Sequence, residues 1–184
     1  MNTNIFLIYL TLLIISSSEV KHPSQQNIFH SIKNNSSYSD RELNEKGFYK
    51  LKEKDYYEAK KYFLQAIIKN PSVKYYYNNL SIIYMKQGRY KDAYKNLAIA
   101  ILIDPFYVKA LSNMAITCFY LYKFIESYNY YIKAIKVDAE YTNNRFKMSK
   151  IKKEIKKLQK ENPDNQSLKT ILKHLKNRSS QNNQ

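Results

Sequence analysis

The chain has 184 residues, and 44% of them are hydrophobic, so it can bury one core of ordinary size. Two Gly and four Pro are too few for the many tight turns of a β-sandwich or barrel, which excludes an all-β fold. More than half of the net charge of +16 lies in residues 142–184, where twelve Lys and Arg stand against three acidic residues. An anionic partner would therefore bind there rather than in the middle of the chain.

Residues 1–18 are predicted to be a signal peptide. Residues 5–15, "IFLIYLTLLII", are apolar or neutral, and they are too few to cross a bilayer as a helix, which takes about 20 residues. Ser16, Ser17 and Ser18 follow, as a cleavage site requires. Because "MNTN" carries no basic residue, an uncleaved signal anchor is the alternative.

Residues 19–39 are predicted to be a disordered, transit-like segment. Between Glu19 and Asp40 the chain has no acidic residue but many Ser and Asn, with Lys and His. A signal followed by such a segment resembles the bipartite leader of nucleus-encoded proteins sent to a relict plastid, the apicoplast. A linker in a secreted protein is the alternative. We therefore expect entry into the secretory pathway, with the plastid or the exterior as destination.

Residues 40–141 contain three copies of a 34-residue unit, at 40–73, 74–107 and 108–141. Residues 34 positions apart agree in size along seven columns. Two columns are small: Gly47, Ser81 and Ala115, and Ala59, Ala93 and Ser127. Two are bulky: Leu43, Tyr77 and Leu111, and Phe63, Leu97 and Tyr131. We expect the small residues to let two helices approach and the bulky residues to fill the gaps between them.

Each unit is predicted to be a helical hairpin. A further column of Ala66, Ala100 and Ala134 would let the next hairpin dock, and Pro71 and Pro105 would end the second helices of the first two units. The predicted helix pairs are 41–53 with 56–69, 75–87 with 90–103, and 109–121 with 124–137.

In period, order and residue class this pattern resembles the tetratricopeptide repeat (TPR) family. The resemblance implies an all-α fold, a right-handed superhelix of helix-turn-helix repeats, with peptides bound in a concave groove that the first helix of each repeat lines. Three positions depart from the family pattern: Lys50 stands where Tyr is preferred, Ser127 replaces a small Ala, and Ala139 replaces the terminal Pro.

Residues 142–177 are predicted to form basic capping helices. Met148, Ile151, Ile155 and Leu158 share one stripe of the first, and Leu168, Ile171, Leu172 and Leu175 share one stripe of the second. One apolar stripe with a solvated remainder is what the end of a repeat array needs. Residues 178–184 are predicted to be a disordered tail.

The sequence offers no catalytic or metal-binding motif. His22, His30 and His174 all lie outside the repeats, and no Gly-rich phosphate loop or nucleophile motif is present. Cys118 is the single cysteine, so no intrachain disulfide can form, and we expect it to be a buried small hydrophobe. We predict a protein that is not an enzyme and needs no cofactor or metal.

The TPR resemblance implies a groove that binds a peptide segment of a protein partner, as in an adaptor or assembly factor. Asn side chains there could donate to and accept from a peptide backbone, and aromatic neighbours could cover apolar side chains. The predicted groove residues are Asn44, Phe48, Tyr75, Asn78, Asn79, Ile82, Lys86, Lys109, Asn113, Ile116 and Tyr120. The alternative is that these residues only finish a structural surface.

A heat-shock carboxylate clamp is not expected. TPR proteins of that kind use Lys and Asn in the first repeat, Asn in the second, and Lys and Arg in the third. The corresponding residues here are Asn44, Phe48, Asn79, Lys109 and Asn113. Only Lys109 remains of three cations, whereas a carboxylate needs its cations to be held.

The basic tail suggests an alternative function, the binding of RNA or of an anionic membrane surface. Its residues are Lys152, Lys153, Lys156, Lys157 and Lys160. Residues 77–93 also resemble the first helix of an RNA-binding pentatricopeptide repeat, but the period here is 34 rather than 35 residues. Solvation of a capping helix is the simplest explanation of these Lys residues.

Overall fold

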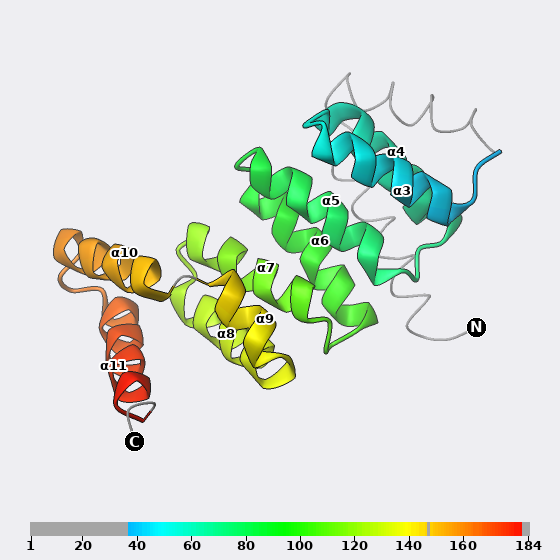
Figure 1. Cartoon of the computed structure of the whole chain (residues 1–184). Coiled ribbons are helices and arrows are strands. Elements are labelled where there is room, and N and C mark those ends of the chain that lie inside the picture. The colour runs from blue at the N-terminus through cyan, green and yellow to red at the C-terminus, as the bar shows by residue number, and fades with distance from the viewer. Residues whose placement is uncertain (1–36, 147, 182–184) are drawn as a thin grey trace. The chain divides into compact units, whose positions relative to one another are not determined.

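The computed structural model describes residues 37–146 and 148–181, and all regular structure in these residues is helical (Figure 1). The predicted signal peptide and residues 19–36 lie outside the described residues, as do residues 147 and 182–184. The chain divides between Pro105 and Phe106 into two compact units, each described by itself.

The first unit contains α3 (Asp40–Lys52), α4 (Tyr56–Lys69), α5 (Lys74–Lys86) and α6 (Tyr90–Ile103). Helix α3 packs on α4 and α5 on α6, and α4 joins the two hairpins through its contact with α5. Figure 1 shows the two hairpins side by side. These helices begin and end within one residue of the ranges predicted from the 34-residue period.

The first hairpin begins at Ser39, inside the segment that was predicted to be disordered. The Ser39 hydroxyl accepts from the backbone N–H of Glu42, 3.2 Å away, and the Glu42 carboxylate accepts from the Ser39 N–H at 2.7 Å. This reciprocal pair is a capping box, which satisfies free N–H groups at the start of α3. Helix α3 itself begins at Asp40, where the first repeat was predicted to begin, and the "SDRE" spacing at residues 39–42 is the sequence signal for its cap.

Close helix approach explains the small column of the repeats. A Cβ atom on Gly47 would lie 2.7 Å from the Phe63 ring, so only glycine fits without a shift of that ring. Ser81 and Ala115 occupy the same column in the other hairpins and are also buried. Ser127, which departs from the family pattern, donates its hydroxyl to the Ala115 carbonyl at 2.7 Å.

The turns inside the three hairpins share a left-handed residue. Lys54, Gly88 and Tyr122 have φ angles of 63°, 71° and 60°, and they lie 34 residues apart. Only glycine adopts this conformation without steric cost, so the first and third turns hold a side chain where the second has none.

The second unit contains α7 (Val108–Tyr120), α8 (Phe124–Val137), α9 (Ala139–Arg145), α10 (Met148–Glu161) and α11 (Gln166–Gln181). Helices α7 and α8 form the third hairpin. Sequence reasoning did not resolve α9. Because Ala139 stands where the earlier repeats have Pro, Asp138 both ends α8 and caps α9, its carboxylate accepting from the Tyr141 N–H at 2.8 Å.

The predicted capping helices pack through their apolar stripes. Ile155 of α10 and Leu168 and Ile171 of α11 are buried in one cluster with Phe124 of α8, and Ile151, Leu158 and Leu172 pack against it. Met148 and Leu175, the remaining stripe residues, have no described side-chain placement. Helix α11 continues to Gln181, four residues into the predicted tail, because neither Pro nor Gly follows Leu175 to end it.

No helix within residues 37–146 and 148–181 combines the length and the apolar character that a membrane span requires.

Candidate peptide-binding surfaces

The predicted groove residues of the first unit gather around a pair of amides. Asn79 of α5 donates from Nδ2 to Oδ1 of Asn44 on α3 at 2.9 Å, which links the first helices of two neighbouring repeats. Phe48 lies one turn after Asn44 and is 46% exposed, and Tyr75 lies one turn before Asn79 and is 50% exposed. An amide pair with an exposed aromatic ring on each helix therefore forms this face, which we call the first-helix face.

The remaining predicted residues of this unit differ in accessibility. Ile82 is half-buried and Lys86 is exposed, so both reach the surface. Asn78 is only 3% exposed, because it lies about 100° around α5 from Asn79 and faces inward. It is not at the surface that the groove prediction required.

Cations lie over both exposed rings of the first-helix face. The Lys52 ammonium is 4.9 Å from the centroid of Phe48, and the Lys74 ammonium is 5.2 Å from that of Tyr75. Lys74 also forms an ion pair with Asp104 of α6. The face thus presents two aromatic rings with an ammonium group beside each, and one of these, Lys74, already has Asp104 as its partner.

A polar cluster holds the two hairpins of the first unit together. Asp40 Oδ2 accepts from the Tyr76 hydroxyl at 2.7 Å and from Asn70 Nδ2 at 3.1 Å. The Tyr76 hydrogen bond is the largest cause that lowers the pKa of Asp40 below its usual value of 3.8. Burial, and then the bond to Asp40, raise the pKa of Tyr76. Ionised Asp40 and neutral Tyr76 therefore stabilise each other.

In the second unit the predicted groove residues on α7 do not all face solvent. Lys109 is exposed, whereas Asn113 is only 3% exposed. Asn113 Oδ1 accepts from Arg145 Nη2 of α9 at 3.0 Å. Sequence reasoning missed Arg145 because it lies beyond the repeats, in a helix whose position the 34-residue period does not predict.

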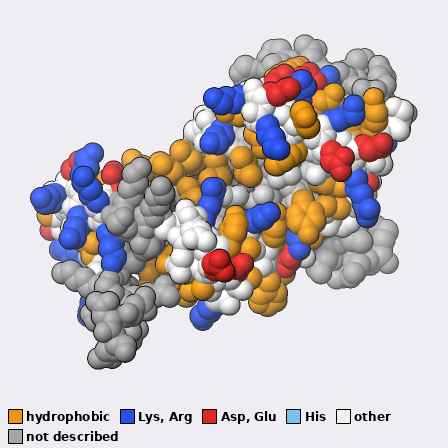
Figure 2. Space-filling model, in the orientation of Figure 1, with side chains coloured by type: hydrophobic (Ala, Val, Ile, Leu, Met, Phe, Trp, Pro, Cys, Tyr) orange, Lys and Arg blue, Asp and Glu red, His pale blue; other side chains and the backbone are white. Residues whose placement is uncertain are grey.

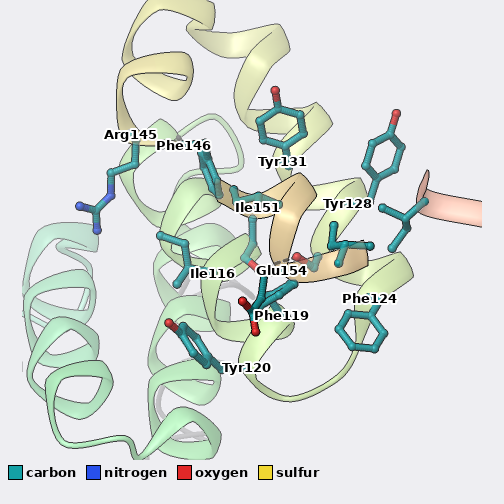
Figure 3. Close-up of a pocket in the computed structure, with 14 residues that line it drawn as sticks. Ile116, Phe119, Tyr120, Phe124, Tyr128, Tyr131, Arg145, Phe146, Ile151 and Glu154 are labelled. Atoms are coloured by element: carbon teal, nitrogen blue, oxygen red, sulfur yellow. Dashed lines mark hydrogen bonds between the residues drawn. The ribbon is translucent and has the colours of Figure 1, made fainter. Parts of the chain in front are cut away.

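Ile116 and Tyr120 of α7 line a pocket of about 530 Å³ (Figure 3). The pocket lies between the third hairpin and the helices that follow it, and its walls are mostly apolar. The aromatic lining residues are Phe119, Tyr120, Phe124, Tyr128, Tyr131 and Phe146. The aliphatic lining residues are Ala115, Ile116, Ile151, Ile155 and Ile171.

Two charged side chains also line this pocket. Arg145 comes from α9 and Glu154 from α10, and Figure 3 shows them on either side of Ile116. Neither forms an ion pair with a side chain whose placement the structure describes, a set that leaves out residues 147–150, although Arg145 donates to the neutral Asn113. The pocket therefore combines an apolar interior with one charge of each sign.

The predicted basic tail residues lie on the outer side of α10. Lys153, Lys156, Lys157 and Lys160 are exposed and Lys152 is half-buried. Figure 2 shows Lys side chains gathered on this helix. Lys157 Nζ lies 3.9 Å from Glu161 Oε1, which is a long ion pair between two exposed side chains. The arrangement leaves several positive charges directed to solvent.

Two findings bear on metal binding and on the reactivity of the single cysteine. In residues 37–146 and 148–181 no three His, Cys, Asp or Glu side chains come together as a metal site would require. Cys118 is fully buried, as predicted, and burial is the main cause that raises the pKa of its thiol to about 12. A thiol that stays protonated is a poor nucleophile.

Comparison with solved structures identifies the fold. The TPR domain of Sgt2 from Aspergillus fumigatus has a TM-score of 0.53 and 20% identity, covering 78% of this chain and 81% of that one. The Arabidopsis OM64 TPR domain has a TM-score of 0.54 and 20% identity, and the match covers 76% of this chain and 96% of that one. The second TPR of Spaghetti (RPAP3), solved with the HSP90 peptide SRMEEVD, has a TM-score of 0.54 and 21% identity, covering 59% and 99%. The chain has the TPR fold.

No family model and no curated protein matches the chain by sequence. The TPR fold confirms the predicted fold class and the predicted resemblance, including the all-α hairpin architecture. At these identities the likeness establishes the fold alone, so the partner of this TPR chain has to be argued from its own surfaces.

Proposed function

We propose that the chain is a non-catalytic interaction module, an adaptor or assembly factor, that binds a peptide segment of a protein partner through the first helices of its TPR repeats. Two solved structures of the same fold support the proposal, since Spaghetti (RPAP3) was solved with an HSP90 peptide and yeast Sti1 in a complex with pHsp70.

The observation that carries the proposal is the first-helix face of the first unit. Its amide pair, Asn44 and Asn79, spans two repeats, and Phe48 and Tyr75 stand about half exposed beside it. Exposed aromatic rings beside amides can anchor an apolar side chain while the amides bond a peptide backbone. Lys52, over the Phe48 ring, favours an acidic residue in that peptide, whereas Lys74 over Tyr75 is already paired with Asp104.

The proposal departs from a heat-shock carboxylate clamp. At the corresponding positions Asn44 and Asn79 bond each other, and Phe48 offers no polar group. Arg145 does bring a cation to Asn113, but it comes from α9 rather than from the repeat itself. We therefore infer that recognition depends on aromatic anchoring more than on the partner's terminal carboxylate.

A display library of random 16-residue peptides, selected on the full chain, tests the proposal. Selected peptides should bind the Phe48→Ala, Tyr75→Ala double variant at least about tenfold more weakly, because two anchors of the face are gone. The control is Tyr49→Ala, Tyr57→Ala, which removes two rings that are 69% and 60% exposed but are not part of the face. Failure of the selection to enrich any peptide would overturn the proposed function.

A second candidate function follows from the outer side of α10. Its apolar stripe is packed on α8 and α11, so its Lys residues point to solvent and could bind the phosphates of RNA or of a membrane surface. We propose this as the alternative, and it predicts binding that weakens steeply with added salt.

A further inference from the structure

The pocket of the second unit arises where the chain leaves the 34-residue period. Helix α9 ends at Arg145, Phe146 takes an extended conformation, and α10 begins at Met148. This interruption lies beside the pocket, where Phe146 of the break and Ile151 of α10 face residues of α7 and α8 (Figure 3). The break and the pocket therefore occur at the same place in the second unit, where the 34-residue period ends.

The size and the lining of the pocket suit an organic ligand better than water. About 530 Å³ falls within the range of specific ligand sites, and most of the lining is aromatic or aliphatic. At its edge Tyr120 is 53% exposed, so a large ring is already presented to solvent. Large apolar side chains or ligand carbons that enter such a pocket leave water, and this burial of apolar surface stabilises the complex.

The charges at the pocket narrow the class of ligand. Arg145 and Glu154 have opposite charges, and neither forms an ion pair with a side chain whose placement the structure describes. A fatty acid or another simple anion would use Arg145 but would be repelled by Glu154. A polyanion would likewise meet the Glu154 carboxylate. A peptide segment can satisfy both charges, because it can carry an acidic and a basic side chain on either side of its apolar residues.

We propose that this pocket takes large apolar side chains of a partner's peptide segment, with an acidic residue of that segment against Arg145 and a basic residue against Glu154. The proposal rests on the proposed function and adds a second anchoring site to it, one built by the third hairpin together with the helices that follow it. Asn113 holds the Arg145 guanidinium from behind through the 3.0 Å hydrogen bond, so it is a positioning residue.

The peptides selected from the random 16-residue library on the full chain also test this proposal. Ile116→Glu places a carboxylate in the apolar pocket and should weaken their binding at least about tenfold. Ile125→Glu is the matched control, because Ile125 is on α8, is 43% exposed and does not line the pocket. Circular dichroism and urea unfolding of both variants establish that each is folded.

A second variant exchanges the two charges of the pocket and tests the same proposal. Arg145→Glu with Glu154→Lys should weaken the selected peptides about tenfold or more, and binding should return when the acidic and basic residues of the peptide are exchanged too. Both changes are at exposed positions, so the fold should survive them. Recovery by the exchanged peptide is a result that mere structural damage cannot produce.

Three outcomes would overturn the proposal in distinguishable ways. If the peptides bind Ile116→Glu normally but lose affinity for the Phe48→Ala, Tyr75→Ala variant, the proposed function stands and the pocket is not part of it. If dodecanoate displaces the peptides or binds the pocket by itself with Arg145 alone required, the ligand is a lipid. If no peptide is enriched, the proposed function fails together with this proposal.

Discussion

The two units of the chain pack their helices by different means. In the first unit, neighbouring hairpins meet through polar links, Asn44 with Asn79 and Asp40 with Tyr76, above a core in which the Phe63 ring lies directly against Gly47. In the second unit, the third hairpin meets helices that do not continue the repeat, and the contact encloses a pocket of about 530 Å³. The helices are closely packed within the 34-residue repeats, and the pocket lies where the repeats end.

This difference teaches where binding specificity can reside in a repeat protein. Repeated columns must satisfy the same contacts in each copy, which restricts their side chains. The helices after the third hairpin have no such restriction, and they supply both charged residues of the pocket, Arg145 and Glu154, together with part of its apolar wall. Substitutions in each unit can test whether the two units differ in packing and by how much.

Truncation of the two equivalent bulky residues should give the largest effects. Phe63→Ala is expected to destabilise the first unit by about 3–5 kcal/mol, because the fully buried ring leaves a cavity. Tyr131→Ala, at the same column, should cost less because Tyr131 already borders the pocket. Urea denaturation measures both losses. Equal losses would mean that the two units are packed alike.

Overpacking between hairpins should have the next largest effect. Ala66 is fully buried on α4, the helix that contacts α5, so Ala66→Leu is expected to cost about 1–3 kcal/mol. Ala98→Leu is the matched control, since Ala98 is exposed on α6. The shift in the urea midpoint checks the difference. An unchanged midpoint for Ala66→Leu would show that the contact is loose.

The polar link of the first unit should give a smaller, pH-dependent effect. Asp40→Asn is expected to cost about 1 kcal/mol at pH 7, the value of a typical hydrogen bond. Because the pKa of Asp40 is lowered in the folded state, its contribution is present above pH 3.8 and is lost as pH falls below that value. The difference from the wild-type free energy of unfolding should therefore shrink in acid.

The control for this change is Asp164→Asn, in the exposed turn between α10 and α11. It should leave the free energy of unfolding unchanged at every pH. A constant Asp40→Asn difference between pH 7 and pH 2 would show that the carboxylate charge does not matter for the link.

The basic face of α10 should contribute least to stability. Replacing Lys152, Lys153, Lys156 and Lys157 with Gln is expected to change the free energy of unfolding by less than about 0.5 kcal/mol, because these residues lie at the surface. The same variant should lose any salt-sensitive binding to single-stranded RNA or to vesicles with anionic lipids. Unchanged retention on heparin would show that the Lys cluster does not form an anion site.

The sequence was sufficient to predict the three repeated helical hairpins. Leu43, Phe63 and their counterparts fixed the register, since residues that must interlock in each hairpin recur at 34-residue spacing, and all three hairpins follow. The fold class and the TPR resemblance are therefore confirmed. The groove residues on these helices stay a prediction, and burial of Asn78 and Asn113 shows that the face of a helix is harder to assign than its ends.

What the sequence could not reveal depends on how non-repeating segments pack. The single stripe of Ile151 and Ile155 predicted that α10 would pack against other helices, but not that a break at Phe146 would precede it or that a pocket would lie beside that break. Arg145 could not be paired with Asn113 for the same reason, because no column relates the two residues. The pocket thus follows from tertiary geometry rather than from a motif.

The left-handed residues in the hairpin turns show where the repeated unit stops. Lys54, Gly88 and Tyr122 lie 34 residues apart, so a fourth duplicated hairpin in the same frame would turn at residue 156. Helix α10 runs through that residue without interruption. The C-terminal segment is therefore not an eroded copy of the unit.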